Sequence, residues 1–158
     1  MGEHIIIMGG GVIGLSCAFE ALRCGYQVSV IEAGQCGGQA SGAAAGMLAP
    51  YSENGVFPDD FFRLCVESLR LYPEWQQSIK EVSGEEFEYT NSGSLYVMYH
   101  EADLTALRQR SNWQNEHGAQ SEIVMQHELR QLEPQLSEDV YAALYTPVES
   151  HVHAPDYV

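Results

Sequence analysis

The fold is decided near the start of the chain by the stretch HIIIMGGGVIG, residues 4–14. Its first five residues are apolar and mostly β-branched, which predicts a strand buried on both faces, as in a parallel sheet. The three glycines end that strand, and apolar residues at three- and four-residue steps predict a helix over residues 12–23. A second β-branched stretch, residues 27–32, predicts another strand. The first 32 residues therefore predict a βαβ unit, the start of a Rossmann-type α/β sheet.

The glycines between strand and helix follow the spacing G-x-G-x-x-G, with Gly9, Gly11 and Gly14 at the fixed positions. In this context Gly9 permits a tight turn, Gly11 permits close approach of a pyrophosphate, and Gly14 permits tight packing of helix on strand. Backbone N–H groups at the helix start bind a diphosphate without a lysine. A glycine turn that binds no ligand stays open as the alternative.

Glu32 lies at the end of the second predicted strand, 18 residues after Gly14. An acidic residue at this spacing typically accepts hydrogen bonds from ribose hydroxyls. No arginine follows it, which disfavours a ligand with a 2′-phosphate. The alternative is a solvated charge at a strand end.

Residues 33–50 form a second segment with small side chains, containing five glycines and a run of alanines. Such a segment supplies little core volume, so its backbone is expected to approach another group closely. Ser41 is a candidate helix cap. A second set of accessible N–H groups suits a ligand longer than a diphosphate, such as a flavin, although a packed small-residue helix is the alternative.

Downstream of residue 58 the pattern changes from parallel to antiparallel character. A helix is expected over residues 58–82, kinked or split at Pro73, followed by a hairpin-like pair of strands at residues 87–89 and 95–99. Further elements are expected as a helix over 102–116, a strand near 123, a helix over 127–132 and a strand over 140–145. A doubly wound sheet needs about five or six strands. Because only two strands here have parallel character, we expect the sequence to be the N-terminal part of a longer protein.

Composition limits the classes of partner. The chain has 22 acidic and 7 basic residues, a net charge of −15, and Lys80 as its only lysine. Without a basic stripe, nucleic acid and anionic membranes are poor candidates as partners. The four cysteines show no metal or redox spacing, those of the first helix (Cys17 and Cys24) are expected to be buried, and no signal peptide is recognisable. We therefore expect a cytoplasmic protein without a metal.

The same residues resemble a known family. The glycine pattern at 9–14, Glu32 and especially SGAAAGML at residues 41–48 are similar to the FAD-binding N-terminus of the D-amino-acid-oxidase-like oxidoreductases, within them the glycine oxidase branch of thiamine biosynthesis. The segments SLRLYPEW (68–75), NSGSL (91–95) and HVHAPDYV (151–158) also resemble that family, so the resemblance covers the whole chain.

The resemblance implies a role for each matching position. Val12 and Ile13 would contact the FAD phosphates through their backbone, and Glu32 with Ala33 would hold the adenosine ribose. The remaining positions would serve the diphosphate (Ala40, Ser41) and the isoalloxazine ring (Ala45, Gly46, Met47). Met47 would also lie near the substrate pocket, while the catalytic residues of the family would fall beyond Val158.

The implied function is FAD-dependent oxidation of glycine or another small amino acid or amine, by hydride transfer to flavin, with oxygen as acceptor and hydrogen peroxide as product. A related dehydrogenase that uses a quinone, a truncated non-catalytic nucleotide-binding protein and an NAD-linked dehydrogenase stay open as alternatives. We expect the complete protein to be a homo-oligomer. Its expected divisions are part of the FAD domain (1–84), part of an antiparallel α+β substrate domain (85–150) and the return to the FAD domain (151–158).

Overall fold

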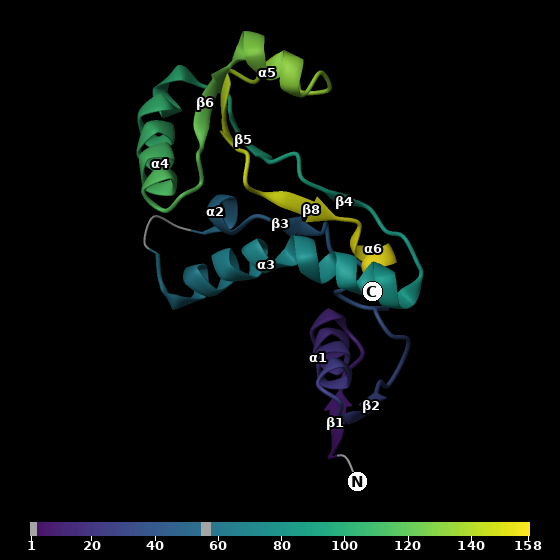
Figure 1. Ribbon diagram of the computed structural model, residues 1–158. Helices are drawn as coiled ribbons and strands as arrows, with labels where there is room; N and C mark the ends of the chain where they lie inside the picture. Colours follow the sequence, from purple (N-terminus) through teal and green to yellow (C-terminus); the bar gives the residue numbers. More distant parts are fainter. Residues whose placement is uncertain (1–2, 55–57) are drawn as a thin grey trace. The chain divides into compact units, whose positions relative to one another are not determined.

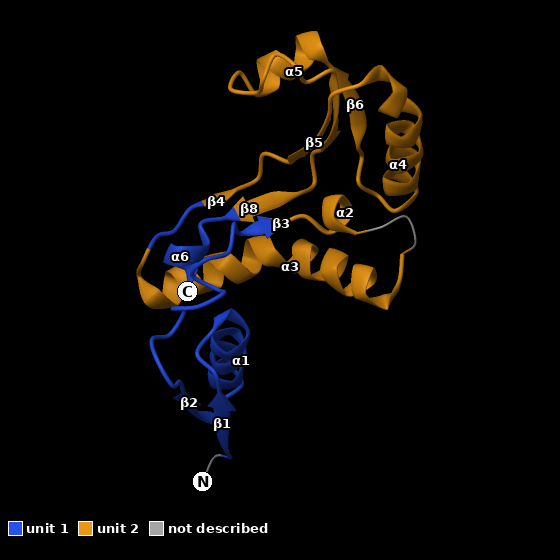
Figure 2. Cartoon of the chain, turned by 180° about the vertical axis from the view of Figure 1, so that it is seen from behind, with its two compact units in different colours: residues 1–47, 86–88, 152–158 blue, residues 48–85, 89–151 orange. Residues whose placement is uncertain are grey.

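The computed structural model describes residues 3–54 and 58–158. The chain divides into two compact units, residues 1–47, 86–88 and 152–158 in unit 1 and residues 48–85 and 89–151 in unit 2 (Figure 2). Figure 1 labels the elements, which in chain order are β1 (His4–Met8), α1 (Val12–Arg23), β2 (Gln27–Ile31), β3 (Met47–Leu48), α2 (Pro50–Glu53), α3 (Asp60–Ser83), β4 (Tyr89–Thr90), β5 (Ser94–Met98), η1 (Glu101–Asp103), α4 (Leu104–Glu116), β6 (Glu122–Met125), α5 (Gln126–Leu132), β7 (Ala142–Thr146), β8 (Ser150–Val152) and α6 (Ala154–Tyr157).

Unit 1 begins with the expected βαβ arrangement. β1 and β2 pair in parallel with His4 opposite Gln27 and Met8 opposite Ile31. The helix α1 connects them and ends where the glycine predicts: Gly25 has a φ of +87°, a left-handed conformation that costs glycine little. The strand, glycine turn, helix and strand of the sequence prediction are all confirmed.

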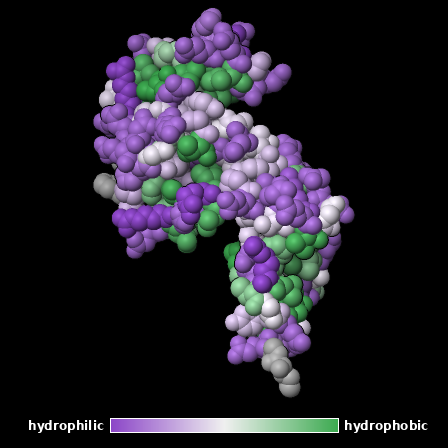
Figure 3. All heavy atoms as spheres, viewed as in Figure 1, coloured by the Kyte–Doolittle hydropathy of each residue, from purple (hydrophilic) through white to green (hydrophobic). Residues whose placement is uncertain are grey.

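The burial of this unit differs from the expectation. β1 was expected to be covered on both faces, yet Ile6 is 61% exposed and Met8 86% exposed. Cys17 of α1 and Cys24, which directly follows this helix, are exposed as well, although small buried side chains were expected. Figure 3 shows apolar surface in green over the α1 region. The physical reason is that, in the part of the chain that the structure describes, β1 has β2 as its only strand partner.

Unit 2 contains the long helix α3 and an antiparallel sheet. The Asp59 side chain caps α3 by accepting a hydrogen bond from the Phe62 N–H at 2.8 Å, and Gly84 ends the helix with a φ of +73°. The sequence predicted that Pro73 would kink or split this helix. The helix continues through Pro73 without interruption, so the split does not occur.

The core of unit 2 lies around the central strand of this sheet, whose order is β5-β7-β6. Ala142, Ala143 and Leu144 of β7 are fully buried. Met98 and Leu107, from β5 and α4, pack on Leu144, and Leu129 of α5 packs with Ala143. Because β7 is covered by α4 and α5, it carries a side-chain core of the kind that β1 lacks.

The expected hairpin at residues 87–99 is wrong. β4 belongs to a sheet of order β3-β8-β4, whereas β5 pairs antiparallel with β7, with Ser94 opposite Thr146. The turn at residues 91–93 therefore takes the chain from one sheet to the other. β5 pairs with β7 over five residues, whereas β4 is only two residues long and offers less pairing. A protein-wide domain division at residues 84 and 150 stays a prediction. No helix within the described ranges is long and apolar enough to cross a bilayer.

Candidate functional site

The glycine turn of unit 1 brings the start of α1 against the end of β1. Gly9 has a φ of +107°, and its N–H donates to the Ile31 carbonyl at 2.8 Å. A Cβ atom on Gly14 would lie 2.0 Å from the Gly9 carbonyl oxygen. Only glycine at position 14 permits this approach of helix to turn, as the spacing predicts.

The start of α1 presents backbone N–H groups that the helix itself does not use. Gly11 precedes the helix in an extended conformation and, as a glycine, has no side chain that could cap it. The Val12 N–H donates instead to Ser41 Oγ at 3.0 Å, and the Ile13 side chain is 79% exposed. The N-terminus of this 12-residue helix is thus open to an anion, with Ser41 beside it.

Glu32 lies next to the same turn. Its carboxylate accepts a hydrogen bond from the Gly10 N–H at 2.7 Å and another from the Gly34 N–H at 2.9 Å. These two N–H groups, Gly10 first, lower the pKa of Glu32 below its ordinary value, because they stabilise the charged form. The ionised carboxylate keeps lone pairs that can accept hydrogen bonds from hydroxyls.

Residues 36–43 form turns rather than the packed small-residue helix that was the alternative. The Gly37 N–H donates to the Gly10 carbonyl at 2.9 Å, which ties this segment to the glycine turn. Ser41 caps α1 rather than a helix of its own, which the sequence did not indicate. Ala33 and Ala40 are exposed.

The segment with Ala45, Gly46 and Met47 is held by another part of unit 1. Gly46 has a φ of +77°, and its carbonyl accepts a hydrogen bond from the Val152 N–H at 2.9 Å. A Cβ atom on Gly46 would lie 1.8 Å from the Val152 carbonyl oxygen. Backbone packs directly on backbone here, while the Met47 side chain is 51% exposed.

The structure therefore brings the glycine turn, Glu32 and Ser41 together, and it holds Ala45–Met47 through Val152. It also adds Gly10, a residue without an assigned role in the sequence analysis. A Cβ atom on Gly10 would lie 2.6 Å from Cys36 Sγ and 3.1 Å from Glu32 Cβ. Three consecutive glycines were the available signal for it. A cradle of N–H groups beside a carboxylate fits the diphosphate and ribose of a dinucleotide.

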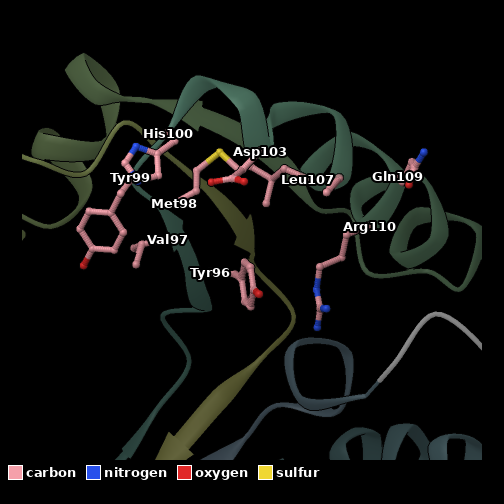
Figure 4. Close-up of a pocket in the computed structure, with 10 residues that line it drawn as sticks. Tyr96, Val97, Met98, Tyr99, His100, Asp103, Leu107, Gln109 and Arg110 are labelled. Carbon is pink, nitrogen blue, oxygen red and sulfur yellow. The ribbon is translucent and has the colours of Figure 1, made fainter.

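The cavity in Figure 4 is a different feature. It measures about 650 Å³ and lies in unit 2, where β5, η1 and α4 line it. Apolar side chains such as Met98 and Leu107 share this lining with Arg110. None of the residues proposed from the glycine pattern lines it, because those residues belong to unit 1.

Metal-ligating side chains do not gather in groups of three or more within residues 3–54 and 58–158. His151 lies in β8, whereas His153 follows that strand and its Nδ1 lies 2.8 Å from a carboxylate oxygen of Asp156.

Comparison with known proteins gives a consistent result. The family model described as FAD dependent oxidoreductase matches residues 4–158. Glycine oxidase of Bacillus subtilis is 28% identical over 152 residues, covering 96% of this chain and 39% of that protein. The bifunctional protein ThiO/ThiG of Trichormus variabilis is 33% identical over 153 residues, covering 97% of this chain and 23% of that protein.

Solved structures agree with these relatives. The crystal structure of glycine oxidase from Geobacillus kaustophilus matches with a TM-score of 0.89 at 29% identity, covering 98% of this chain and 42% of that chain. Glycine oxidase from Bacillus cereus matches with a TM-score of 0.87 at 30% identity, covering 99% and 41%. The chain thus spans about two fifths of the glycine oxidases that it matches.

Proposed function

The chain belongs to the family of FAD-dependent oxidoreductases, and we propose that it forms part of an enzyme that oxidises glycine or another small amino acid or amine. The observation that carries this proposal is the cradle of unit 1, in which Ser41 and Glu32 stand at the glycine turn before α1. The similarity to glycine oxidases supports the substrate class.

Each part of the cradle suits one part of FAD. In this proposal the N–H groups of Val12 and Ile13 donate to the diphosphate, the Val12 N–H sharing its hydrogen between a phosphate oxygen and Ser41 Oγ, and the Ser41 hydroxyl can itself donate to a phosphate oxygen. The Glu32 carboxylate, beside Ala33, accepts from ribose hydroxyls in the same proposal. Ala40 belongs to the diphosphate side in this proposal, and Ala45, Gly46 and Met47 to the isoalloxazine ring.

When bound, FAD supplies the redox chemistry, accepting a hydride from the substrate α-carbon and passing the electrons to an acceptor. The protein's part is to bind, orient and exclude water. Gly46, locked against Val152, holds the backbone on both sides of it in place, and Met47 offers an exposed apolar side chain as a wall for a small substrate. The hydride step needs no strong base from this chain once the amine is deprotonated.

Several finer features belong to the same proposal. Oxygen is the proposed acceptor and hydrogen peroxide the product, in a cytoplasmic homo-oligomer that serves thiamine biosynthesis. The names of the relatives support two of these features: glycine oxidase supports oxygen as acceptor, and ThiO/ThiG supports a role in thiamine biosynthesis.

The decisive test is a visible absorbance spectrum of the complete gene product, followed by addition of glycine without oxygen. Flavin bands that bleach with glycine are the expected result, since the substrate reduces the flavin. Bleaching followed by rapid recovery in air, with hydrogen peroxide formed, supports oxygen as acceptor. Recovery only with an added quinone would replace the oxidase by a dehydrogenase.

Two other results would contradict the proposal. Flavin bands that do not change with glycine or other small amino acids would reject the substrate class while retaining the cofactor. A colourless protein that binds no added FAD would reject the assigned roles of the cradle and favour a non-catalytic protein.

A further inference from the structure

A buried carboxylate in unit 2 holds the short helix α2. Glu149, in the turn between β7 and β8, has no exposed surface. Its Oε1 accepts hydrogen bonds from the N–H groups of Tyr51 at 2.7 Å and Ser52 at 2.8 Å. Its Oε2 accepts from the Ser52 hydroxyl at 2.5 Å and from the Ser94 hydroxyl. Both oxygens are therefore satisfied by neutral donors, three of which belong to the segment of α2.

A cation holds the opposite side of the same segment. Arg110 extends from α4 toward α2 (Figure 4), where its Nη2 donates to the carbonyls of Ser52 at 2.5 Å, Tyr51 at 3.1 Å and Asn54 at 3.3 Å. Its guanidinium lies 4.7 Å from the centroid of the Tyr96 ring. Gln114 adds a second donor to the Tyr51 carbonyl at 3.1 Å, and its own oxygen accepts from Thr146 Oγ1.

The signs of the two charges match the backbone that they contact. A single helical turn leaves its N–H groups unpaired at one end and its carbonyls at the other. The anion Glu149 binds the N–H groups of α2, and the cation Arg110 binds its carbonyls. A four-residue helix is unstable by itself. Its geometry is therefore imposed by side chains from the β7–β8 turn and from α4, together with the packing of the Tyr51 ring on Phe62 of α3.

The chain path gives this clamp a functional meaning. α2 begins at Pro50, three residues after Met47, the residue proposed to line the substrate pocket. Leu48, Ala49 and Pro50 join Met47 to Tyr51, and Ala49 and Pro50 are buried, so the position of α2 limits where the Met47 backbone can lie. Met47 is also anchored on its other side, by Gly46 against Val152.

We propose that Glu149 and Arg110 are positioning residues for the substrate: by clamping residues 50–54 from both ends, they fix the backbone that carries Met47 into the pocket. This inference rests on the proposed function, and it assigns substrate affinity to two residues that touch neither FAD nor substrate in that proposal.

The experiment measures the glycine dependence of anaerobic flavin bleaching in the complete, FAD-loaded gene product. In Glu149→Gln an amide NH₂ group replaces one of the two carboxylate oxygens. This group cannot accept the hydrogen bonds that the N–H and hydroxyl groups around Glu149 now donate to that oxygen. We expect the apparent Kd for glycine to rise on the order of tenfold, while the FAD content of the folded protein changes little, because the cradle at α1 and Glu32 is untouched. Glu138→Gln is the matched control, because Glu138 is exposed and paired with Arg130.

Arg110 provides a second test, in which a lysine substitution is expected to preserve its contacts and a methionine substitution is expected to remove them. All its hydrogen bonds to α2 come from Nη2, so a lysine ammonium can replace them while methionine cannot. Arg110→Lys should keep glycine affinity within a few fold of wild type, and Arg110→Met should lose affinity as Glu149→Gln does. Ser94→Ala removes one of the four donors to Glu149 and should give a smaller loss of glycine affinity. It replaces Glu149→Gln as the test of the positioning role if that variant does not fold.

A purely structural role would give a different pattern. The variants would then melt at lower temperature, yet their FAD-loaded fraction would bleach with wild-type glycine affinity, and that result would overturn the inference. Wild-type protein that binds FAD but does not bleach with any small amino acid would instead defeat the proposed function, and the positioning role with it.

Discussion

The two compact units bury their strands to different degrees. In unit 2 the central strand β7 has Ala142, Ala143 and Leu144 fully buried. In unit 1 the paired strands β1 and β2 expose Ile6 at 61% and Ile31 at 56%. Unit 1 instead uses close backbone contacts, such as Gly14 on Gly9 and Gly46 on Val152. One unit is therefore organised by side-chain packing, and the other by close backbone contacts at glycines around the proposed FAD site.

The largest expected effect comes from adding a methyl group where backbone meets backbone. In Gly14→Ala the new Cβ would lie 2.0 Å from the Gly9 carbonyl oxygen, so helix and turn must separate. This should destabilise unit 1 by about 3 kcal/mol or more, against a gain of about 1 kcal/mol in helix propensity. We expect colourless protein, with loss of amide-exchange protection in residues 3–31 and retention in β7.

Gly11→Ala is the matched control for that substitution. Its Cβ would meet only Ser41 Oγ, at 3.1 Å, so the βαβ unit should keep its exchange protection while FAD binding weakens. Gly11→Val, with a branched side chain at the approach of the pyrophosphate, should be recovered folded and colourless. Normal yellow protein from Gly11→Val would remove Gly11 from the site.

Truncation of a core side chain in unit 2 should reduce amide-exchange protection in unit 2 and leave unit 1 protected, the reverse of the result expected for Gly14→Ala. Leu144→Ala leaves a cavity at a fully buried position of β7, against Met98 and Leu107, and should cost about 2–5 kcal/mol. Exchange protection should fall in β5, β6 and β7 while the α1 region keeps its own. Equal loss in both units would show that they unfold together and would remove the contrast between them.

The smallest expected effect is the pH dependence linked to Glu32. Because hydrogen bonds from Gly10 and Gly34 lower its pKa, the ionised carboxylate stabilises the folded unit above the ordinary pKa of a glutamate. That contribution is lost as the pH falls through the lowered value. Thermal melts should show a shallower acid decline for Glu32→Gln than for wild type.

Glu67→Gln serves as the comparison for that variant. The pKa of Glu67 is also lowered, but by its partner Arg70 on the exposed face of α3 in unit 2. Its removal should leave flavin retention at acid pH unchanged, whereas Glu32→Gln should weaken FAD binding at neutral pH as well. Identical flavin retention in the two variants would argue against contact between Glu32 and the ribose.

Sequence reasoning succeeded where the signal was local. The bounds of β1 and α1 follow from β-branched residues, apolar periodicity and the glycines between them. It failed for the strand partners of residues 87–99, because a turn at Asn91 to Gly93 is compatible with a hairpin and with a change of sheet. It also missed that Ser41 caps α1, since the cap and the helix are 29 residues apart.

The clamp on α2 gave no sequence signal at all. Glu149 and Ser52 are 97 positions apart, and Arg110 is 58 positions from Ser52. Each of these residues, taken singly, has the appearance of an ordinary surface charge or hydroxyl. Only the folded unit shows that these two opposite charges contact complementary ends of one helical turn.

By itself the sequence determined the βαβ unit, the glycine positions and the acidic residue after the second strand, because these depend on backbone freedom and side-chain size over short separations. The tertiary structure decided which strands pair, which apolar residues are covered and how Glu149 and Arg110 converge on residues 50–54. Those features depend on contacts between segments distant in the chain, whose free energy no local pattern records.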